Sequence, residues 1–457
     1  MTIETAIAAL KDALGDRIST SRADREFHGR SETHFPDRPA DAVAFPESTE
    51  EVSRIVRICA DHGCPIIAWG TGTSLEAHAV PVRGGVSLDM MRMNRVLAIH
   101  PEDMDVVVQP GVTREDLNAE LRATGLFFPV DPGANASLGG MAATRASGTT
   151  AVRYGTMREN VLSMEVVLAD GRIIRTGSRA RKSSAGYDLT HLMIGSEGTL
   201  GIITEMTLRL QGQPEAISAA ICDFPDISAA VDTVIETIQM AIPVARIEFV
   251  DELTARAFNI YAKADLPERP HLFLEFHGSE NAVREQAETV GEIVRSHGGG
   301  DFRWSTKAEE RTALWKMRHN AFYAQKSLKP ESDAIATDIC VPISRLAEAV
   351  TETRADIEAS GLLGPMLGHV GDGNFHCTFL LTPGAEAEKR AAKDLLHRLS
   401  LRALDMGGTV TGEHGVGIGK LGYMQQEHGE AWSVMSEIKR ALDPDNILNP
   451  GKLVALN

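Results

Sequence analysis

Two glycine-rich segments constrain the fold of this chain more than any other feature. The first, GTGTS at 70–74, follows an apolar run at 65–69 that predicts a strand. The second spans 132–155, about 60 residues later, and is too apolar for a linker and too glycine-rich for a regular element. Such backbones approach ligands closely, and their N–H groups suit a pyrophosphate. The pair predicts a site for a long dinucleotide; a plain tight turn at 70–74 is the alternative.

The first loop departs from the Rossmann dinucleotide motif. That motif requires a third glycine at position 75 and a helix that begins there. Position 75 is Leu, and the residues that follow it carry no helix cap. A nicotinamide dinucleotide bound to a doubly wound sheet is therefore disfavoured.

Length, charge and cysteine usage exclude several classes of protein. A chain of 457 residues is long enough for more than one domain, and its net charge of −17 argues against nucleic acid as a partner. No run approaches the ~18 apolar residues of a membrane helix, so we expect no integral membrane segment. The five cysteines form no C-x-x-C pair, and Glu4 stands where a leader peptide is basic. We therefore expect a cytoplasmic protein, at most peripheral at a membrane.

Local patterns predict an α+β chain. Ser48 and Glu51 fit a capping box for a helix that Gly63 ends, and short apolar strands surround this helix. A hairpin is expected to turn at 170–171. The segment 211–214 is the expected domain boundary, because helical patterns alternate with strands beyond it.

The segment GHVGDGNFH at 368–376 carries the densest chemistry. Asp-Gly between alternating strands predicts a two-residue turn at 372–373, which places His369 directly opposite His376 on one face. Opposed residues have Cβ atoms about 4.5–5.5 Å apart, so one divalent cation could bridge both imidazoles. The alternative is a pair of hydrogen-bonded histidines on a sheet face.

Glu413 and His414 lie between glycines in GEHG at 412–415, with room to approach a ligand. A carboxylate completes a His–His–carboxylate set, which suits zinc, manganese or iron. The helix-borne zinc motifs of peptidases are absent from the sequence. A flavin-independent metallohydrolase nevertheless stays open as an alternative.

A substrate carboxylate needs a cationic partner. The segment ALWKMRHNAFYA at 313–324 offers Arg318, the natural bidentate partner of a carboxylate, close to Trp315. The alternative for Arg318 is an ordinary surface salt bridge.

The motifs GTGTSLEAH, DPGANASLGGMAATRASG, VRYGT and GSEGTLGIIT resemble those of the vanillyl-alcohol-oxidase family, whose FAD-binding domain is of the PCMH type. Within the family, the chain resembles the FAD-linked, cytochrome-type D-lactate dehydrogenase branch. The resemblance implies an α+β fold, in which a two-subdomain FAD-binding domain is followed by an α+β cap domain. The implied segments are an N-terminal arm at 1–37, the FAD-binding domain at 38–213, the cap with the metal site at 214–420 and a returning C-terminal segment at 421–457.

The resemblance also implies the cofactor contacts. The first loop holds Thr and Ser where some relatives carry a flavin-linked His, so FAD is expected to be non-covalent. The implied contacts are Gly70, Thr71, Gly72, Thr73, Ser74, Leu75, Pro132, Gly133, Ser137, Leu138, Gly139, Gly140, Thr144, Ser147, Gly148, Tyr154, Glu197, Gly201, Ile202 and Asn449.

By the same resemblance, His369, His376 and Glu413 are the ligands of one divalent metal, and His414 is the catalytic base. Arg318 and Trp315 bind the substrate. The implied reaction is oxidation of D-lactate or another D-2-hydroxy acid to the 2-oxo acid, by hydride transfer to flavin N5. Three electron acceptors stay open: cytochrome c, a quinone and an electron-transferring flavoprotein. A homodimer is expected.

Two alternatives keep the fold and change the role. One is the FAD subunit of a glycolate oxidase, and the other is a D-2-hydroxyglutarate dehydrogenase. By the same resemblance, relatives that bind a second carboxylate commonly carry a basic residue just before the Asp of TDICVP. Here Ala336 and Thr337 precede Asp338, which argues against hydroxyglutarate.

Overall fold

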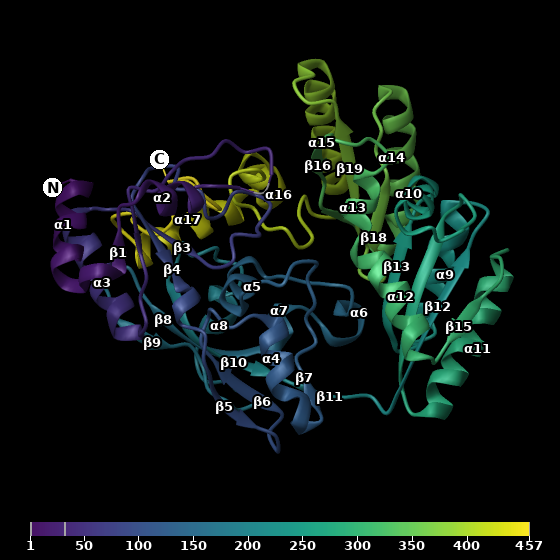
Figure 1. The fold of residues 1–457 in the computed structure, drawn as a ribbon, viewed down its shortest axis with the longest axis horizontal. Coiled ribbons are helices and arrows are strands. Elements are labelled where there is room, and N and C mark those ends of the chain that lie inside the picture. Colours follow the sequence, from purple (N-terminus) through teal and green to yellow (C-terminus); the bar gives the residue numbers. More distant parts are fainter. Residues whose placement is uncertain (1, 32, 457) are drawn as a thin grey trace. The chain divides into compact units, whose positions relative to one another are not determined.

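The computed structural model describes residues 2–31 and 33–456. The chain forms two compact units, each with its own hydrophobic core (Figure 1). Unit 1 consists of Met1–Ser147, Gly155–Gln213 and Glu413–Asn457. Unit 2 consists of Gly148–Tyr154 and Pro214–Gly412, so residues 413–420 group with unit 1 rather than with the cap.

Unit 1 contains a four-stranded sheet in the order β1-β2-β4-β3, in which β2, β4 and β3 are parallel. The helix before β3 begins at the predicted residue, because the Ser48 hydroxyl accepts the N–H of Glu51. The reciprocal half of the expected capping box is replaced, since the Glu51 carboxylate accepts the N–H of Glu47 instead of that of Ser48. It ends at Gly63, whose φ of 61° is left-handed. The elements are α1 (Ile3–Leu14), β1 (Ile18–Ser19), α2 (Arg22–Phe27), β2 (Ala42–Ala44), α3 (Thr49–His62), β3 (Ile66–Trp69) and β4 (Val86–Asp89). Because β3 ends at Trp69, the loop 70–74 begins at the carboxyl end of a buried parallel strand.

The second sheet of unit 1 is antiparallel, in the order β5-β6-β10-β8-β9. The predicted hairpin forms, since Val167 pairs with Ile173 across a turn that contains Asp170 and Gly171. The strands are β5 (Val96–His100), β6 (Asp105–Val108), β8 (Val161–Val167), β9 (Ile173–Arg175) and β10 (Ile202–Arg209), with β7 (Leu126–Phe127) and β11 (Gln211–Gly212) as a separate pair. The helices are α4 (Arg114–Glu120), α5 (Leu138–Thr144), α7 (Met157–Asn160), α8 (Leu189–Met193), α16 (Met424–His428) and α17 (Glu430–Leu442).

Helix α5 corrects one prediction, because the glycine-rich segment 132–155 was expected to hold no regular element. Leu138, Met141 and Ala142 recur at helical spacing and are fully or almost fully buried in the unit 1 core. Burial of this face offsets the low helix propensity of the adjacent glycines.

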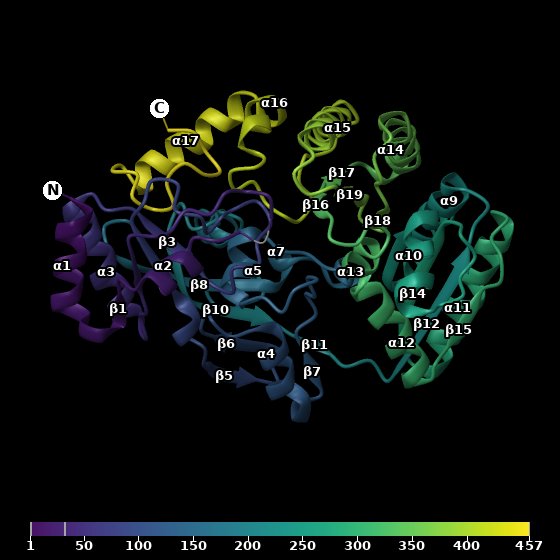
Figure 2. The ribbon, with the colours of Figure 1, turned by 45° about the horizontal axis from the view of Figure 1, so that its top comes forward.

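Unit 2 is built on an eight-stranded sheet in the order β15-β12-β14-β13-β18-β19-β16, with β17 also paired to β19. Its strands are β12 (Ala216–Asp223), β13 (Val244–Val250), β14 (His271–Gly278), β15 (Arg303–Ser305), β16 (Asp333–Ala336), β17 (Ile339–Cys340), β18 (Met366–His369) and β19 (Asn374–Leu381). Its helices are α6 (Ala151–Tyr154), α9 (Ile227–Gln239), α10 (Glu252–Ala262), α11 (Glu280–Ser296), α12 (Ala308–His319), α13 (Ala321–Lys326), α14 (Leu346–Ser360) and α15 (Glu386–Asp405). Figure 2 shows α14 and α15 side by side.

The two faces of this sheet differ in chemistry. Ile247 and Phe249 of β13 lie in the main core, with apolar side chains of α9, α11, α14 and α15. The alternate residue Glu248 points to the opposite face, because successive side chains of a strand alternate. On that face α10, α12 and α13 supply a smaller apolar cluster that includes Trp315. The polar residues of interest in unit 2 lie on this second face.

Candidate functional site

The hairpin β18–β19 forms, but in a register that differs from the predicted one. His369 pairs with Asn374, and Leu367 pairs with His376, so the prediction that His369 lies directly opposite His376 is wrong. The connecting loop is Val370–Gly373 rather than two residues, and Asp372 N–H donates to the His369 carbonyl at 3.0 Å. A Cβ at Gly373 would lie 2.1 Å from the Val341 carbonyl oxygen, so packing against this backbone helps to set the turn.

The two histidines nevertheless share a face, because the register differs from the predicted one by two residues. Side chains alternate with a period of two, and diagonal neighbours remain within reach of ring side chains. The ring centroids of His369 and His376 are 5.6 Å apart, and each ring offers a ligand atom within 4.8 Å of the other. Val370 and Phe375 are fully buried in the core of unit 2, as expected.

Hydrogen bonds fix the orientation of both imidazoles. His376 Nδ1 lies 3.0 Å from the Thr337 carbonyl oxygen, and His369 Nδ1 lies 2.7 Å from Glu248 Oε1. A carbonyl oxygen only accepts hydrogen bonds, so Nδ1 of His376 carries the proton; an ionised Glu248 requires the same of His369. In the neutral imidazole the lone pair is then on Nε2. A ring held in this way has Nε2 available as a metal ligand.

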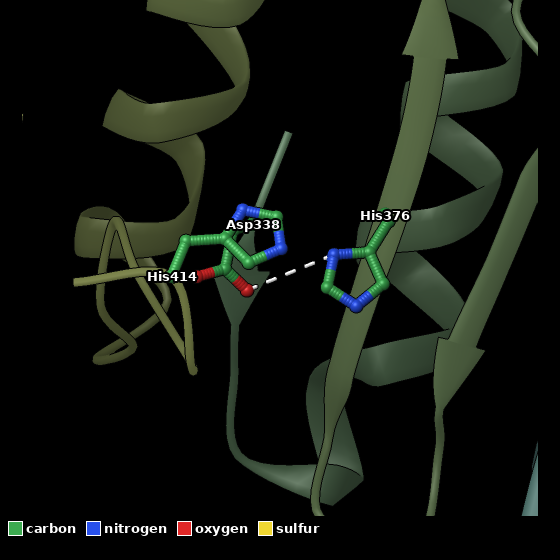
Figure 3. A group of neighbouring side chains, drawn as sticks. All are labelled: Asp338, His376 and His414. Atoms are coloured by element: carbon green, nitrogen blue, oxygen red, sulfur yellow. Dashed lines mark ion pairs between the residues drawn. The ribbon is translucent and has the colours of Figure 1, made fainter. Parts of the chain in front are cut away.

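Asp338 is fully buried beside this pair and was not predicted to take part. Its Oδ1 accepts the Asn374 amide at 2.9 Å, and its Oδ2 accepts the Thr411 hydroxyl at 2.7 Å. Figure 3 draws Asp338 and His376 together with His414, and its dashed line marks the 3.7 Å between Asp338 Oδ1 and His376 Nδ1. An acidic residue within the largely apolar run 335–341 was the available sequence signal.

The end of unit 2 is attached to this cluster. Gly412 donates its N–H to the Asp338 carbonyl at 3.3 Å, and a Cβ at position 412 would lie 2.3 Å from Asn374 Nδ2. Glu413 and His414 follow directly as the first residues of the last segment of unit 1. Because consecutive Cα atoms are about 3.8 Å apart, the Cα of Glu413 is confined close to that of Gly412.

Arg318 lies in the last turn of α12 and is only 6% exposed. Its Nη2 donates to Glu248 Oε2 at 2.5 Å, while its buried Nε has no hydrogen-bond partner among the described residues. The ion pair is therefore buried rather than on the surface. Trp315, one turn earlier, is equally buried, and the Arg246 guanidinium lies 4.6 Å from its ring centroid. Arg318 thus retains a buried donor for an acidic ligand.

In unit 1 the two predicted glycine loops meet. A Cβ at Gly70 would lie 2.3 Å from Ser137 Oγ, and a Cβ at Gly140 would lie 3.0 Å from the same oxygen. Ser137 is 1% exposed, and its hydroxyl has no hydrogen-bond partner among the described residues. A buried hydroxyl without a partner, between two glycine backbones, fits the phosphates of a dinucleotide.

A third group of loops joins this region within unit 1. The Glu197 carboxylate accepts the N–H groups of Val416 and Gly417 at 2.7 and 2.9 Å. Asn449 donates its amide to the Glu197 and His78 carbonyls at 2.7 and 3.1 Å. Burial raises the pKa of Glu197, but the nearby His78 and these N–H groups outweigh it and hold that pKa below its usual value. Glu197 and Asn449 therefore belong to one connected network.

Other expected cofactor contacts have structural roles of their own. Leu138 is fully buried in the core, and a Cβ at Gly139 would lie 2.5 Å from Pro110. A Cβ at Gly201 would lie 2.3 Å from Val166, and Tyr154 donates to or accepts from His277 Nδ1 at 2.7 Å within unit 2. The remaining positions are distributed as follows: Thr71, Gly72, Thr73, Ser74 and Leu75 in the first loop, Pro132 and Gly133 before α5, Thr144 at its end, Ser147 and Gly148 after it, and Ile202 at the start of β10.

Comparison with known proteins identifies the family. The FAD binding domain family matches residues 40–177, and the C-terminal domain family of the FAD linked oxidases matches residues 213–453. The chain is 50% identical over 459 residues to a Danio rerio protein named "Probable D-lactate dehydrogenase, mitochondrial", covering 99% of this chain and 92% of the relative. It is 48% identical over 451 residues to an Arabidopsis thaliana protein named "D-lactate dehydrogenase [cytochrome], mitochondrial", covering 98% and 80%. The chain belongs to the FAD-linked oxidases with a PCMH-type FAD-binding domain.

A solved structure supports the fold. The chain superimposes on the 4-ethylphenol oxidase from Gulosibacter chungangensis with a TM-score of 0.81 at 21% identity, covering 98% of this chain and 96% of that one. The expected α+β architecture, with an FAD-binding domain and a C-terminal cap-type domain, is thereby confirmed.

The expected location is wrong. We expected a cytoplasmic protein, at most peripheral at a membrane, whereas both relatives described above are named as mitochondrial proteins. In the described part of the chain, no helix is long and apolar enough to cross a membrane. The net charge and the acidic Glu4 were too little information to decide the compartment. Targeting depends on a short segment rather than on the folded domains.

Proposed function

We propose that the protein is an FAD- and divalent-metal-dependent dehydrogenase that oxidises D-lactate, and related D-2-hydroxy acids, to the 2-oxo acid. The observation that carries this proposal is the pair of histidines on β18 and β19 whose Nδ1 atoms are both held by acceptors, beside a buried arginine. The names of the relatives at 48–50% identity favour D-lactate as the substrate.

The residues of unit 1 fit a non-covalently bound FAD. Gly70, Ser137 and Gly140 would hold the phosphates, because they leave a hydroxyl and backbone amides where a side chain would not fit. The network of Glu197 and Asn449 would support the loops around the rest of the cofactor. When bound, FAD supplies a two-electron acceptor for the substrate, and a metal supplies a Lewis acid that lowers the pKa of the substrate hydroxyl.

The Nε2 atoms of His369 and His376 would bind the metal, and Glu413 would supply the carboxylate. Glu413 is favoured because it is joined directly to Gly412, whose backbone is docked on Asp338. Two imidazoles and one carboxylate suit zinc, manganese or iron. Asp338 would not need to bind the metal, since its oxygens already accept hydrogen bonds from Asn374 and Thr411.

Arg318 would bind the substrate carboxylate, and Trp315 would form the wall beside it. The buried Nε of Arg318 provides the donor, and the ion pair with Glu248 holds the guanidinium in place. His414 would accept the hydroxyl proton on a ring nitrogen, since an imidazole has a pKa suited to this task near neutral pH. Ala336 and Thr337, which precede Asp338, offer no cation for a second carboxylate.

The electron acceptor proposed is a cytochrome, because the Arabidopsis relative carries that word in its name. A quinone and an electron-transferring flavoprotein are the outcomes to compare. Reoxidation of the reduced protein by each acceptor, followed by stopped-flow absorbance, separates them.

Anaerobic mixing with chiral 2-hydroxy acids tests the function. D-lactate should bleach the visible flavin absorbance and yield pyruvate, and L-lactate should do so far more slowly. Glycolate and D-2-hydroxyglutarate are measured on the same sample. Bleaching by glycolate but not by D-lactate would contradict the proposal, as would hydrolytic turnover by protein stripped of flavin.

A further inference from the structure

Glu248 occupies a position in unit 2 that ordinary packing does not explain. It lies on β13, pairs with Phe273 of β14, and is only 1% exposed. Both of its strand neighbours, Ile247 and Phe249, point into the main apolar core. A carboxylate at such a site loses its hydration, so its burial requires strong partners.

The two oxygens of Glu248 serve two different side chains. Oε1 accepts the Nδ1–H of His369 at 2.7 Å, and Oε2 accepts Nη2–H of Arg318 at 2.5 Å. His369 comes from β18 and Arg318 from α12, so one carboxylate connects residues that are 51 positions apart in the sequence. Both contacts are charge-assisted, and each fixes the orientation of a planar group.

We propose that Glu248 is a positioning residue that holds a metal-binding histidine and the substrate-binding arginine in one fixed relation. The inference rests on the proposed function for the roles of His369 and Arg318. The Nδ1 contact keeps the lone pair of His369 on Nε2 and raises its basicity as a ligand. The Nη2 contact aims the remaining donors of Arg318 and prevents the side chain from turning towards other carboxylates.

The chemistry of this position requires two acceptors. A glutamine has the same shape, but one end is a carbonyl oxygen and the other is an NH₂ donor. If the oxygen faces His369, the NH₂ group faces the Arg318 donor; if the amide is flipped, the NH₂ group faces the Nδ1–H. In Glu248→Gln, one N–H donor of the amide therefore faces another N–H donor. His369 can relieve this repulsion by moving its proton from Nδ1 to Nε2, which removes the lone pair from the atom proposed to bind the metal.

Glu275 on the neighbouring strand β14 provides a matched control. It is 5% exposed, accepts from His277 Nε2 at 2.8 Å, and lies 3.5 Å from Arg246 Nε. It is thus also a buried carboxylate between a histidine and an arginine, on the same sheet. Its histidine is not one of the proposed ligands, so Glu275→Gln reproduces the loss of a buried charge without touching His369.

The test measures metal affinity directly. Wild type, Glu248→Gln, Glu248→Asp and Glu275→Gln are stripped of metal, and Zn²⁺ affinity is determined by competition with a chromophoric chelator. Flavin content by visible absorbance and thermal unfolding by circular dichroism are recorded for each protein. We expect about 10–100-fold weaker Zn²⁺ binding in Glu248→Gln, with flavin retained, and an affinity within about twofold of wild type in Glu275→Gln. The KM for D-lactate should also rise in Glu248→Gln, because Arg318 loses its support.

The outcomes separate this inference from the proposed function. Wild-type Zn²⁺ affinity in a folded Glu248→Gln protein overturns the inference. If Glu248→Gln does not fold, Glu248→Asp decides, since the shorter side chain cannot span both donors and must also weaken Zn²⁺. Equal weakening in Glu275→Gln shows a general effect of buried charge and overturns the inference as well. Zn²⁺ binding that depends on Glu248, in a protein that oxidises no 2-hydroxy acid, supports the inference and overturns the proposed function.

Discussion

Ser137 Oγ lies so close to Gly70 that a Cβ there would approach it to 2.3 Å. This relation joins two loops that are far apart in the sequence, and a side chain at position 70 would force the Ser137 hydroxyl to turn away. The proposed placement of the FAD phosphates in unit 1 rests on this relation.

Gly70→Ala should therefore weaken FAD binding. The added methyl group forces the Ser137 hydroxyl out of its position between the two glycine loops, where we propose that it meets the phosphates. The expected loss is about 1–3 kcal/mol, which corresponds to about 5–150-fold in affinity. The flavin-to-protein ratio after gel filtration and the dissociation constant for added FAD measure the effect. Gly212→Ala is the control, because a Cβ at Gly212 meets no atom of residues 2–31 and 33–456 within 4 Å. Full flavin content in Gly70→Ala would show that the loop does not contact the cofactor.

Metal removal should abolish turnover and leave the flavin in place, because two of the three proposed ligands, His369 and His376, belong to unit 2, whereas the FAD loops belong to unit 1. Dialysis against a chelator, followed by metal analysis and assay, measures this. His376→Ala should prevent reloading with Zn²⁺ or Mn²⁺. His191→Ala should not, since both ring nitrogens of His191 already have partners, Asp188 and the Arg158 carbonyl. Undiminished activity in metal-free protein would contradict a metal-dependent reaction.

His414→Ala should keep flavin and metal and lose activity. The loss of a general base lowers the rate of the chemical step by about 10²–10⁴-fold. Single-turnover reduction by D-lactate measures this step without the electron acceptor. A variant that bleaches at the wild-type rate would remove His414 from the mechanism.

Lys452 should make stability depend on pH. Burial lowers the pKa of its ammonium group to about 7, against the opposing effect of Glu197, and its Nζ donates to Asn449 Oδ1 at 2.6 Å. Above pH 7 the folded protein therefore binds fewer protons here than the unfolded chain, which keeps an ordinary lysine pKa near 10.5. Stability from this group rises with pH over that interval, by at most about 1.4 kcal/mol per pH unit.

Comparison of wild type with Lys452→Met at pH 7 and pH 9 isolates this contribution. The difference between the melting temperatures of the wild type and the variant should shift in favour of the wild type as the pH is raised from 7 to 9. The difference between proteins is used because the other titrating groups are common to both. A constant difference would show that Lys452 keeps the same charge in the folded and unfolded chains.

The hairpin at 366–381 shows where prediction from sequence succeeds and where it fails. The Asp-Gly pair identified the turn, and the alternation of residues placed both histidines on one face. The register was wrong because the turn is longer, and at Gly373 it packs against the carbonyl of Val341, a contact 32 residues away in the sequence. The two histidines still share one face because the register shift is an even number of residues; an odd shift would place them on opposite faces.

Glu248 shows a different limit. It lies 121 residues from His369 and 70 from Arg318, and the strand that carries it has no motif. Asp338 was likewise missed as a partner, although its segment was noted. Both become visible only when the sheet of unit 2 brings its strands together.

The sequence by itself determined what depends on neighbours in the chain: the cap at Ser48, the stop at Gly63, the hairpin at 170–171 and the glycine loops. It also determined which residue types carry the chemistry. Imidazole, carboxylate and guanidinium side chains are uncommon within apolar or glycine-rich segments, so those that do occur there stand out as candidates. Only the tertiary structure decided how these groups are held, namely the lone pairs of His369 and His376, the partner of Arg318 and the contact of Ser137 with Gly70. These depend on strand order and on packing between distant segments, and local rules carry no information about either.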